Sequence, residues 1–381
     1  MKVFKNALVY VEGEGLKKCD LTFDERIREI GEGSSLGAEV ISLPAGAVVL
    51  PGFIDEHIHG AGGADAMDGT HAALATIAKT VAAEGTTGFL ATTMTQSPEN
   101  IKGALSAANE YIKNPECGAR LLGVHLEGPF IAAKHKGAQP LEYVAKPSVE
   151  VFEEYQKAAG GNIKIVTLAP EEEGAEELVC YLHGHGVIAS IGHSGAAHAD
   201  VVKALEKGAT HITHTYNAQS PLHHREAGVV GSALLLDELS CELIADGIHV
   251  SVPAMKLLAK SKPQGKLILI TDAIRAKGLG DGESELGGQT VYVKNGEARL
   301  EDGTLAGSVL RMNRAVQNLV EKVGVPFTEA VDCATKNPAR DLGLLEEIGS
   351  IRVGKRADFT VLDEEYNVVL TVVGGKIAYR A

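Results

Sequence analysis

Short apolar runs alternate along most of the chain with longer segments in which apolar residues recur every three or four positions. The short runs are rich in β-branched residues, which is typical of buried strands, and the longer segments are typical of amphipathic helices. The strand candidates are residues 48–54, 86–92, 121–126, 163–168, 187–191, 211–215, 241–245 and 266–271. The helix candidates are residues 72–84, 101–112, 173–185, 196–206 and 312–323.

This alternation predicts a parallel sheet, because a helix carries the chain back to the start of the next parallel strand. Eight such units in residues 51–348 match a (β/α)8 TIM barrel. An open, doubly wound sheet is the alternative, but the first strand is not followed by the G-x-G-x-x-G turn of dinucleotide-binding sheets. The predicted fold class is therefore α/β with a (β/α)8 barrel.

The two ends of the chain have a different pattern. Residues 1–50 and 349–381 consist of short alternating segments separated by turns such as Gly374-Gly375, without a long helical period. Because chain termini often lie close together, we predict that residues 1–50 plus 349–381 form one small β-sandwich domain beside the barrel of residues 51–348.

Composition and charge exclude several classes of partner. The 381 residues are 45% hydrophobic and 23% charged, as in ordinary globular proteins. The 36 basic residues are outnumbered by 50 acidic residues, giving a formal net charge of -14. We therefore expect neither nucleic-acid nor membrane binding, since both need surplus positive charge. A phosphorylated substrate would need a local cationic pocket.

The cysteines and the N-terminus bear on the compartment. The five cysteines are scattered and form no C-x-x-C pair, which argues against a disulfide framework and a cysteine-type zinc site. No stretch resembles a secretion signal or a membrane span. These features predict a cytoplasmic protein.

Polar residues gather where the predicted strands end. His57 and His59 follow the first strand, and three later strands end at Glu127, His193 and His214. The carboxyl ends of barrel strands converge on one face, where barrel enzymes carry out their chemistry. His57 and His59 are two residues apart, so both imidazoles point to one side of an extended strand. Imidazole and carboxylate ligands together favour zinc or iron(II).

Two assignments stay open on the residues alone. His211 and His214 compete for the ligand position on the sixth strand, and His214 lies nearer the strand's end. Asp272, at the end of the eighth strand, can accept a proton from a metal-activated water. Asp272 could instead be a further metal ligand or the cap of a following helix.

Several motifs resemble one family. PGFIDEHIHG, HLEGPF, GHSGA, THTYNAQSPLHHREAG, DGIHV, TDAI and LAGS occur in the order and spacing of N-acetylglucosamine-6-phosphate deacetylases, which belong to the amidohydrolase superfamily. The resemblance implies hydrolysis of N-acetylglucosamine 6-phosphate to glucosamine 6-phosphate and acetate. It also implies that the β-rich ends form the family's small domain.

The resemblance also implies roles for the strand-end residues. Glu127, His193 and His214 match the ligands of the main metal ion, and His57 with His59 resembles the pair that holds a second ion. We therefore expect a divalent metal, Zn or Fe, with two ions per subunit of which one is essential. Asp272 matches the general base and acid.

The substrate-binding side follows from the same resemblance. Arg225 and His249 match phosphate-binding residues that reach in from the neighbouring subunit, which implies a homodimer. The other residues implied to contact the phosphorylated N-acetyl amino sugar are Asn217, Ala218, Ala138, Gln139, Leu305 and Ala306. Residues 132–140 match a mobile flap over the pocket. Gln139 departs from the family pattern, which usually has histidine there; glutamine hydrogen-bonds but carries no charge.

Three other functions compete with this interpretation. An N-acetylgalactosamine-6-phosphate deacetylase would differ only at the C4 hydroxyl of the sugar, and no residue distinguishes it. A cyclic amidase or deaminase of the superfamily would not need Arg225 and His249. A non-enzymatic scaffold would be expected to lose metal ligands, whereas this sequence keeps a full set.

Overall fold

A parallel eight-stranded sheet forms the centre of the larger unit in the computed structural model, which describes residues 1–31 and 37–381. Its strands follow one another in chain order, as expected for a (β/α)8 barrel. They are β6 (Phe53–Ile58), β9 (Thr86–Thr92), β10 (Arg120–Glu127), β11 (Ile163–Leu168), β12 (Ile188–Ile191), β13 (Ala209–Ile212), β14 (Ser240–Ile244) and β15 (Leu267–Ile270). The predicted barrel is confirmed.

Hydrogen bonds between the first and last strands join the two edges of this sheet. The backbone N–H of Asp272 donates to the carbonyl of His57 at 2.8 Å. The Thr271 hydroxyl donates to Asp55 Oδ2 at 2.5 Å. Because Asp272 and His57 share this connection, closing the barrel also sets the separation of two candidate site residues.

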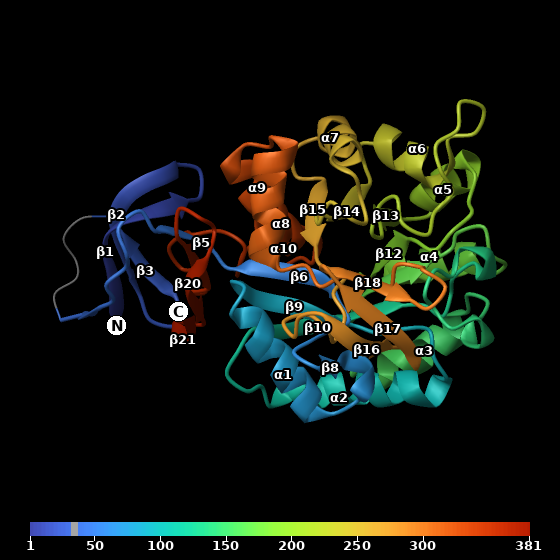
Figure 1. The fold of residues 1–381 in the computed structure, drawn as a ribbon, viewed down its shortest axis with the longest axis horizontal. Helices are drawn as coiled ribbons and strands as arrows, with labels where there is room; N and C mark the ends of the chain where they lie inside the picture. Colours follow the sequence, from blue (N-terminus) through green and yellow to red (C-terminus); the bar gives the residue numbers. More distant parts are fainter. Residues whose placement is uncertain (32–36) are drawn as a thin grey trace.

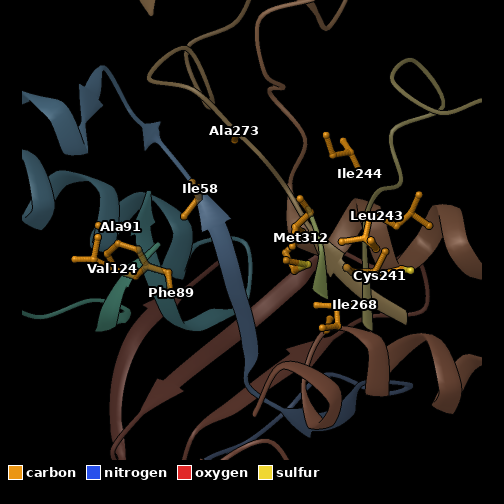
Figure 2. Packing of buried hydrophobic residues seen from close by; sticks show 14 of the residues in the cluster. Ile58, Phe89, Ala91, Val124, Cys241, Leu243, Ile244, Ile268, Ala273 and Met312 are labelled. Atoms are coloured by element: carbon orange, nitrogen blue, oxygen red, sulfur yellow. The ribbon is translucent and has the colours of Figure 1, made fainter. Parts of the chain in front are cut away.

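Helices cover the outside of the barrel. They are α1 (His71–Ala82), α2 (Pro98–Lys113), α3 (Val149–Ala158), α4 (Ala175–Gly184), α5 (His198–Glu206), α6 (Gly228–Leu235), α7 (Val252–Ser261), α8 (Met312–Asn318), α9 (Phe327–Cys333) and α10 (Lys336–Asp341). Short helical turns lie at η1 (Ala66–Asp68), η2 (Ala133–His135) and η3 (Leu141–Tyr143), and α8 continues into a π-helix, η4 (Leu319–Val323). Figure 2 shows buried side chains between strands and helices; Met312 of α8, Ile268 of β15 and Leu243 of β14 belong to one hydrophobic cluster.

The two chain ends meet in a second sheet, which carries both termini at one side of the barrel (Figure 1). The N-terminal strands are β1 (Lys2–Val11), β2 (Gly15–Phe23), β3 (Ile27–Ile30), β4 (Glu39–Val40) and β5 (Val48–Pro51), and the C-terminal strands are β19 (Phe359–Leu362), β20 (Val368–Val373) and β21 (Lys376–Arg380). Phe4, Phe23 and Phe359 pack together with ring centroids 5.0 to 5.9 Å apart. One core thus joins both ends, as predicted.

The first predicted barrel strand, residues 48–54, is divided between the two sheets. Strand β5 pairs with β1 and β19 in the small sheet, whereas β6 pairs with β9 in the barrel. Gly52 lies between them, and a Cβ there would come within 2.1 Å of Thr87 Oγ1. The domain boundaries after residues 50 and 348 stay a prediction, and residues 32–36 of the predicted small domain lie outside the described residues.

Two small antiparallel sheets lie in the loops at the carboxyl ends of the barrel strands. One contains β7 (Gly60–Ala61) and β8 (Ala64–Asp65). The other, which the sequence patterns did not indicate, contains β16 (Gly282–Leu286), β17 (Gln289–Lys294) and β18 (Glu297–Leu300) between β15 and α8. Its Leu286 and Val291 pack with Met94 and Ile274 in a separate hydrophobic cluster. Over the described part of the chain, no helix combines the length and apolar character needed to cross a bilayer.

Candidate active site and metal centre

The candidate metal ligands lie together at the carboxyl ends of four barrel strands. His57 belongs to β6 and His59 follows it, Glu127 ends β10, and His193 and His214 follow β12 and β13. All five side chains are buried. The strand ends converge as the barrel geometry requires, so residues far apart in the sequence share one site.

Glu127, His193 and His214 form the first candidate ligand group. Glu127 Oε1 lies 3.3 Å from His193 Nε2 and 3.1 Å from His214 Nε2. The two Nε2 atoms are 3.0 Å apart. Ligand atoms about 2.1 Å from a tetrahedrally coordinated ion are about 3.4 Å from one another. The three atoms therefore have nearly the mutual spacing of ligands that share one ion.

His57, His59 and Glu127 form a second candidate group, which uses the same carboxylate. Glu127 Oε1 is 3.3 Å from His57 Nε2, and Glu127 Oε2 is 3.2 Å from His59 Nε2. Asp272 Oδ1 lies 3.5 Å from His57 Nε2 and 3.3 Å from His59 Nε2. Glu127 thus stands between two groups of imidazoles, and Asp272 faces the second of them.

Hydrogen bonds on the far side of two rings leave their metal-facing nitrogens free. His193 Nδ1 is 2.9 Å from the carbonyl of His135, which can only accept, so this nitrogen donates. His57 Nδ1 is 2.9 Å from Glu242 Oε2 in the same sense. In the neutral, metal-binding form of each ring, Nε2 would then carry a lone pair, and His57 Nε2 is buried without a hydrogen-bond partner. This arrangement is typical of metal-binding histidines, so the residues fit a divalent ion.

The backbone is in the left-handed region at Ala218 and at three residues of the metal-ligand and proton-transfer cluster. His193, His214 and Asp272 have φ values of 49°, 28° and 48°, although none is glycine. This conformation costs free energy for residues with a Cβ and is concentrated at functional sites. Here it occurs directly after strands β12, β13 and β15, where the chain turns and directs these side chains towards the centre of the barrel mouth.

The cluster favours positive charge near its carboxylates. Burial alone would lower the pKa of His59, but its hydrogen bonds to Asp272 and Glu127 raise that pKa to about 10. Burial alone would raise the pKa of Asp272, but His57 and His59 lower that pKa to about 2. The pKa of Glu127 is likewise well below its ordinary value because the surrounding histidines outweigh its burial. A bound cation would supply the same compensation.

A cavity of about 370 Å³ opens above this cluster. Its size falls within the range of small-molecule sites. Most of the predicted site residues lie in its wall: His59, Glu127, His193, His214, Asp272, Asn217, Ala218, His249, Ala138, Gln139 and Leu305. The other residues of the wall are Met94, Lys134, His135, Gly137, Leu286, Thr304 and Gly307. His57 lies beneath this wall.

Ala306 does not line the cavity, and its role in substrate binding stays a prediction. It is fully buried and packs in the hydrophobic cluster of Leu286 and Val291, away from the cavity wall. Its neighbours Leu305 and Gly307 do line the cavity.

Arg225 and His249, which are expected to reach in from a neighbouring subunit, lie differently relative to the cavity of their own chain, and their contribution across an interface stays a prediction. His249 lies on the wall of its own chain's cavity, and its Nδ1 is 2.6 Å from Asp246 Oδ2. Arg225 is exposed outside that wall, with Nη1 2.7 Å from His224 Nε2. The two residues therefore occupy different positions relative to the site of their own chain.

Other histidine positions are distinguished by their contacts. His211 Nε2 is 3.1 Å from Asp341 Oδ2, away from the ligand groups that include His214. Glu242 was missed, although a carboxylate within the apolar strand β14 was a usable signal. His135 was also missed, and no local signal marks it, because its contribution is a backbone carbonyl.

Comparisons with known proteins agree with this geometry. The model of the Amidohydrolase family matches residues 48–378. The N-acetylglucosamine-6-phosphate deacetylase of Bacillus subtilis (strain 168) is 48% identical over 342 residues, covering 89% of this chain and 86% of that protein. The N-acetylgalactosamine-6-phosphate deacetylase of Escherichia coli O157:H7 is 37% identical over 331 residues, covering 87% and 88%. The crystal structure of the Thermotoga maritima N-acetylglucosamine-6-phosphate deacetylase has a TM-score of 0.90 and 38% identity, covering 100% of both chains.

The raised pKa of His59 predicts how stability depends on pH in chelator-treated protein. The folded-state pKa of about 10 exceeds the ordinary histidine pKa of 6.5, so this stabilisation is complete below about pH 6.5 and is lost as pH rises through about 10. The free energy of unfolding in urea should fall over this range, and His59→Asn should flatten the fall. His71→Asn, at an exposed position on α1, should not flatten it. Equal slopes for His59→Asn and the unmodified protein would contradict this prediction.

Proposed function

This chain belongs to the amidohydrolase family and, within it, to the N-acetylglucosamine-6-phosphate deacetylases, and we propose that it hydrolyses N-acetylglucosamine 6-phosphate to glucosamine 6-phosphate and acetate. The observation that carries the proposal is the position of Asp272. Its carboxylate lies in the cavity wall, directly beside two convergent groups of imidazole and carboxylate ligands. A hydrolase acting on an unactivated amide needs this combination of electrophilic activation and a proton acceptor.

We propose that Glu127, His193 and His214 hold an essential divalent ion, Zn or Fe, and that His57 and His59 hold a second. The imidazole and carboxylate donors suit ions of this class. Such an ion lowers the pKa of a coordinated water and polarises the amide carbonyl. Glu127 belongs to both ligand groups, which supports a carboxylate shared by the two ions.

Asp272 has the two proton-transfer roles in this proposal. Its carboxylate accepts the proton of the attacking water, and afterwards donates that proton to the departing nitrogen on C2 of the sugar. The low pKa of Asp272 keeps it ionised, and therefore able to accept, at neutral pH. The backbone hydrogen bond from Asp272 to His57 keeps the carboxylate beside the ligand groups during both transfers.

The phosphate end of the substrate would lie near His249. Burial alone would lower the pKa of His249, but its hydrogen bond to Asp246 raises that pKa above the ordinary value. More of the imidazole is then positively charged near neutral pH, which favours an anion in this acidic protein. Asn217 and Ala218 lie on the same wall and support the phosphate-binding role.

We further propose a homodimer in which Arg225 reaches the neighbouring subunit's site. Arg225 is exposed, outside its own cavity wall, and its planar guanidinium can bind phosphate through two hydrogen bonds.

The five cysteines are free thiols, which supports the proposed cytoplasmic location. Leu305, Ala138 and Gln139 would line the sugar and acetyl part of the site.

N-acetylgalactosamine 6-phosphate is the second candidate substrate. The relative in Escherichia coli O157:H7 is named for that activity and is 37% identical. The two sugars differ only in the orientation of the C4 hydroxyl, so the metal centre and Asp272 would serve both. A cyclic amidase or deaminase is less well supported because it would have no use for the cationic residues near the cavity.

Replacing the proposed base tests the reaction directly. Asp272→Asn should lower kcat for acetate release from N-acetylglucosamine 6-phosphate by about 10²–10⁴-fold, because the amide cannot accept the proton. Zn content should be unchanged, and Asp237→Asn, at an exposed position, should behave like the unmodified protein. Assays of N-acetylgalactosamine 6-phosphate and unphosphorylated N-acetylglucosamine would rank the substrates. Normal turnover by Asp272→Asn would exclude its proposed role.

The number of metal ions can be counted by elemental analysis. The unmodified protein should bind two ions per chain. The double variant His57→Asn/His59→Asn should keep one, because it leaves Glu127, His193 and His214 intact. His214→Asn should lose the essential ion and with it the activity. If the double variant retained two ions, the proposed second site would be wrong.

A shared site predicts complementation between subunits. Asp272→Asn and Arg225→Ala homodimers should both be impaired, whereas mixed dimers should regain activity, because one of their sites combines an intact Asp272 with the partner chain's intact Arg225. Mixing Asp272→Asn with His249→Ala is the matched control and should give no gain, since His249 lies in its own chain's cavity. No gain in the first mixture would rule out a contribution of Arg225 across the interface.

A further inference from the structure

The flap, residues 132–140, contacts the ligand cluster through one side chain. Gln139 is only 3% exposed. Its Nε2 donates to Glu127 Oε2 at 2.8 Å, and its Oε1 accepts from the backbone N–H of Thr95 at 2.7 Å. The amide nitrogen thus has an acceptor and the amide oxygen has a donor. This pairing determines that the nitrogen end faces Glu127.

The same segment contacts a second ligand through its backbone. The carbonyl of His135 accepts the Nδ1–H of His193, at 2.9 Å. The N–H of Ala132 donates to the carbonyl of His193, also at 2.9 Å. One loop segment therefore contacts metal-ligand candidates that come from two different strands, β10 and β12.

These contacts affect how Glu127 presents its two oxygens. Oε2 receives the hydrogen bond of Gln139, while Oε1 faces His193 and His214 at 3.3 and 3.1 Å. A carboxylate without this bond could rotate about its terminal torsion, which is intrinsically broad. Gln139 has no charge to gain or lose, so it can orient Glu127 without adding a proton to the cluster.

We propose that Gln139 is a positioning residue for Glu127, and that through it the flap and the metal ion stabilise each other. The docked flap holds Glu127 and His193 in the orientation that binds an ion. By thermodynamic reciprocity, a bound ion must then favour the docked flap to the same degree. The inference rests on the proposed metal-dependent function. It gives Gln139 a role in orienting the metal ligand Glu127, in addition to its place in the wall of the substrate cavity.

The structure offers a matched control for the amide contact. Gln289 of β17 donates from Nε2 to the carbonyl of Ala138, at 2.6 Å. It therefore holds the same flap without contacting a ligand candidate. Lys134 is exposed on the flap, and Lys136 is partly exposed, so cleavage by trypsin reports whether the flap is docked.

The experiment measures Zn²⁺ affinity and flap cleavage together in the full-length protein. Gln139→Met keeps the length of the side chain but removes the donor, and it should raise the Zn²⁺ dissociation constant by about 10–100-fold. Gln289→Met should leave that constant unchanged. In the unmodified protein and in Gln289→Met, saturating Zn²⁺ should slow cleavage after Lys134 and Lys136. In Gln139→Met the protection should be largely lost.

Thermal unfolding checks that each variant is folded, and Gln139→Leu replaces Gln139→Met if the latter is not. Unchanged Zn²⁺ affinity in the Gln139 variant would overturn the inference. An equal loss of affinity in the Gln289 variant would also overturn it, because flap packing rather than the amide contact would then be responsible. If the unmodified protein did not bind Zn²⁺, the proposed metal-dependent function would be contradicted as well. A failure of that function is thus distinguished from a failure of the Gln139 inference alone.

Discussion

The need to compensate buried carboxylates organises the site. Glu127 and Asp272 are almost inaccessible to solvent, and an ionised carboxylate removed from water costs several kcal/mol unless positive charge or hydrogen bonds replace its hydration. Four imidazoles lie around Glu127, two of them also facing Asp272. Burial alone would lower the pKa values of His57 and His59, but Glu242, Glu127 and Asp272 raise the pKa of His57, and Asp272 and Glu127 raise the pKa of His59. The same demand for positive charge makes the cluster a good place for a divalent ion.

Much of the fold and the site followed from local patterns. The predicted strand at residues 86–92 coincides with β9, and the apolar rhythm indicated every later barrel strand to within three residues; only the first, residues 48–54, was misplaced. Because parallel strands end at one face, position alone brought Glu127, His193 and His214 together. The same reasoning favoured His214 over His211, whose nearest carboxylate is Asp341.

The remaining features depend on approaches between distant segments, which periodicity does not encode. Nothing local indicates that Gln139 hydrogen-bonds Glu127, or that Glu242 accepts from His57. The division of residues 48–54 depends on close contact between Gly52 and Thr87. The sheet β16–β18 packs on its own small hydrophobic cluster. It lies between β15 and α8, where a single connection from strand to helix was expected.

The joining of both chain ends in one sheet has a consequence for biosynthesis. Phe4 and Phe23 leave the ribosome well before Phe359, against which they pack. Until then these rings lack their contacts with Phe359, and exposed apolar surface of this kind is what chaperones and proteases bind. A prematurely terminated copy would retain that exposure permanently. The stability of the small core therefore depends on synthesis having continued through β19.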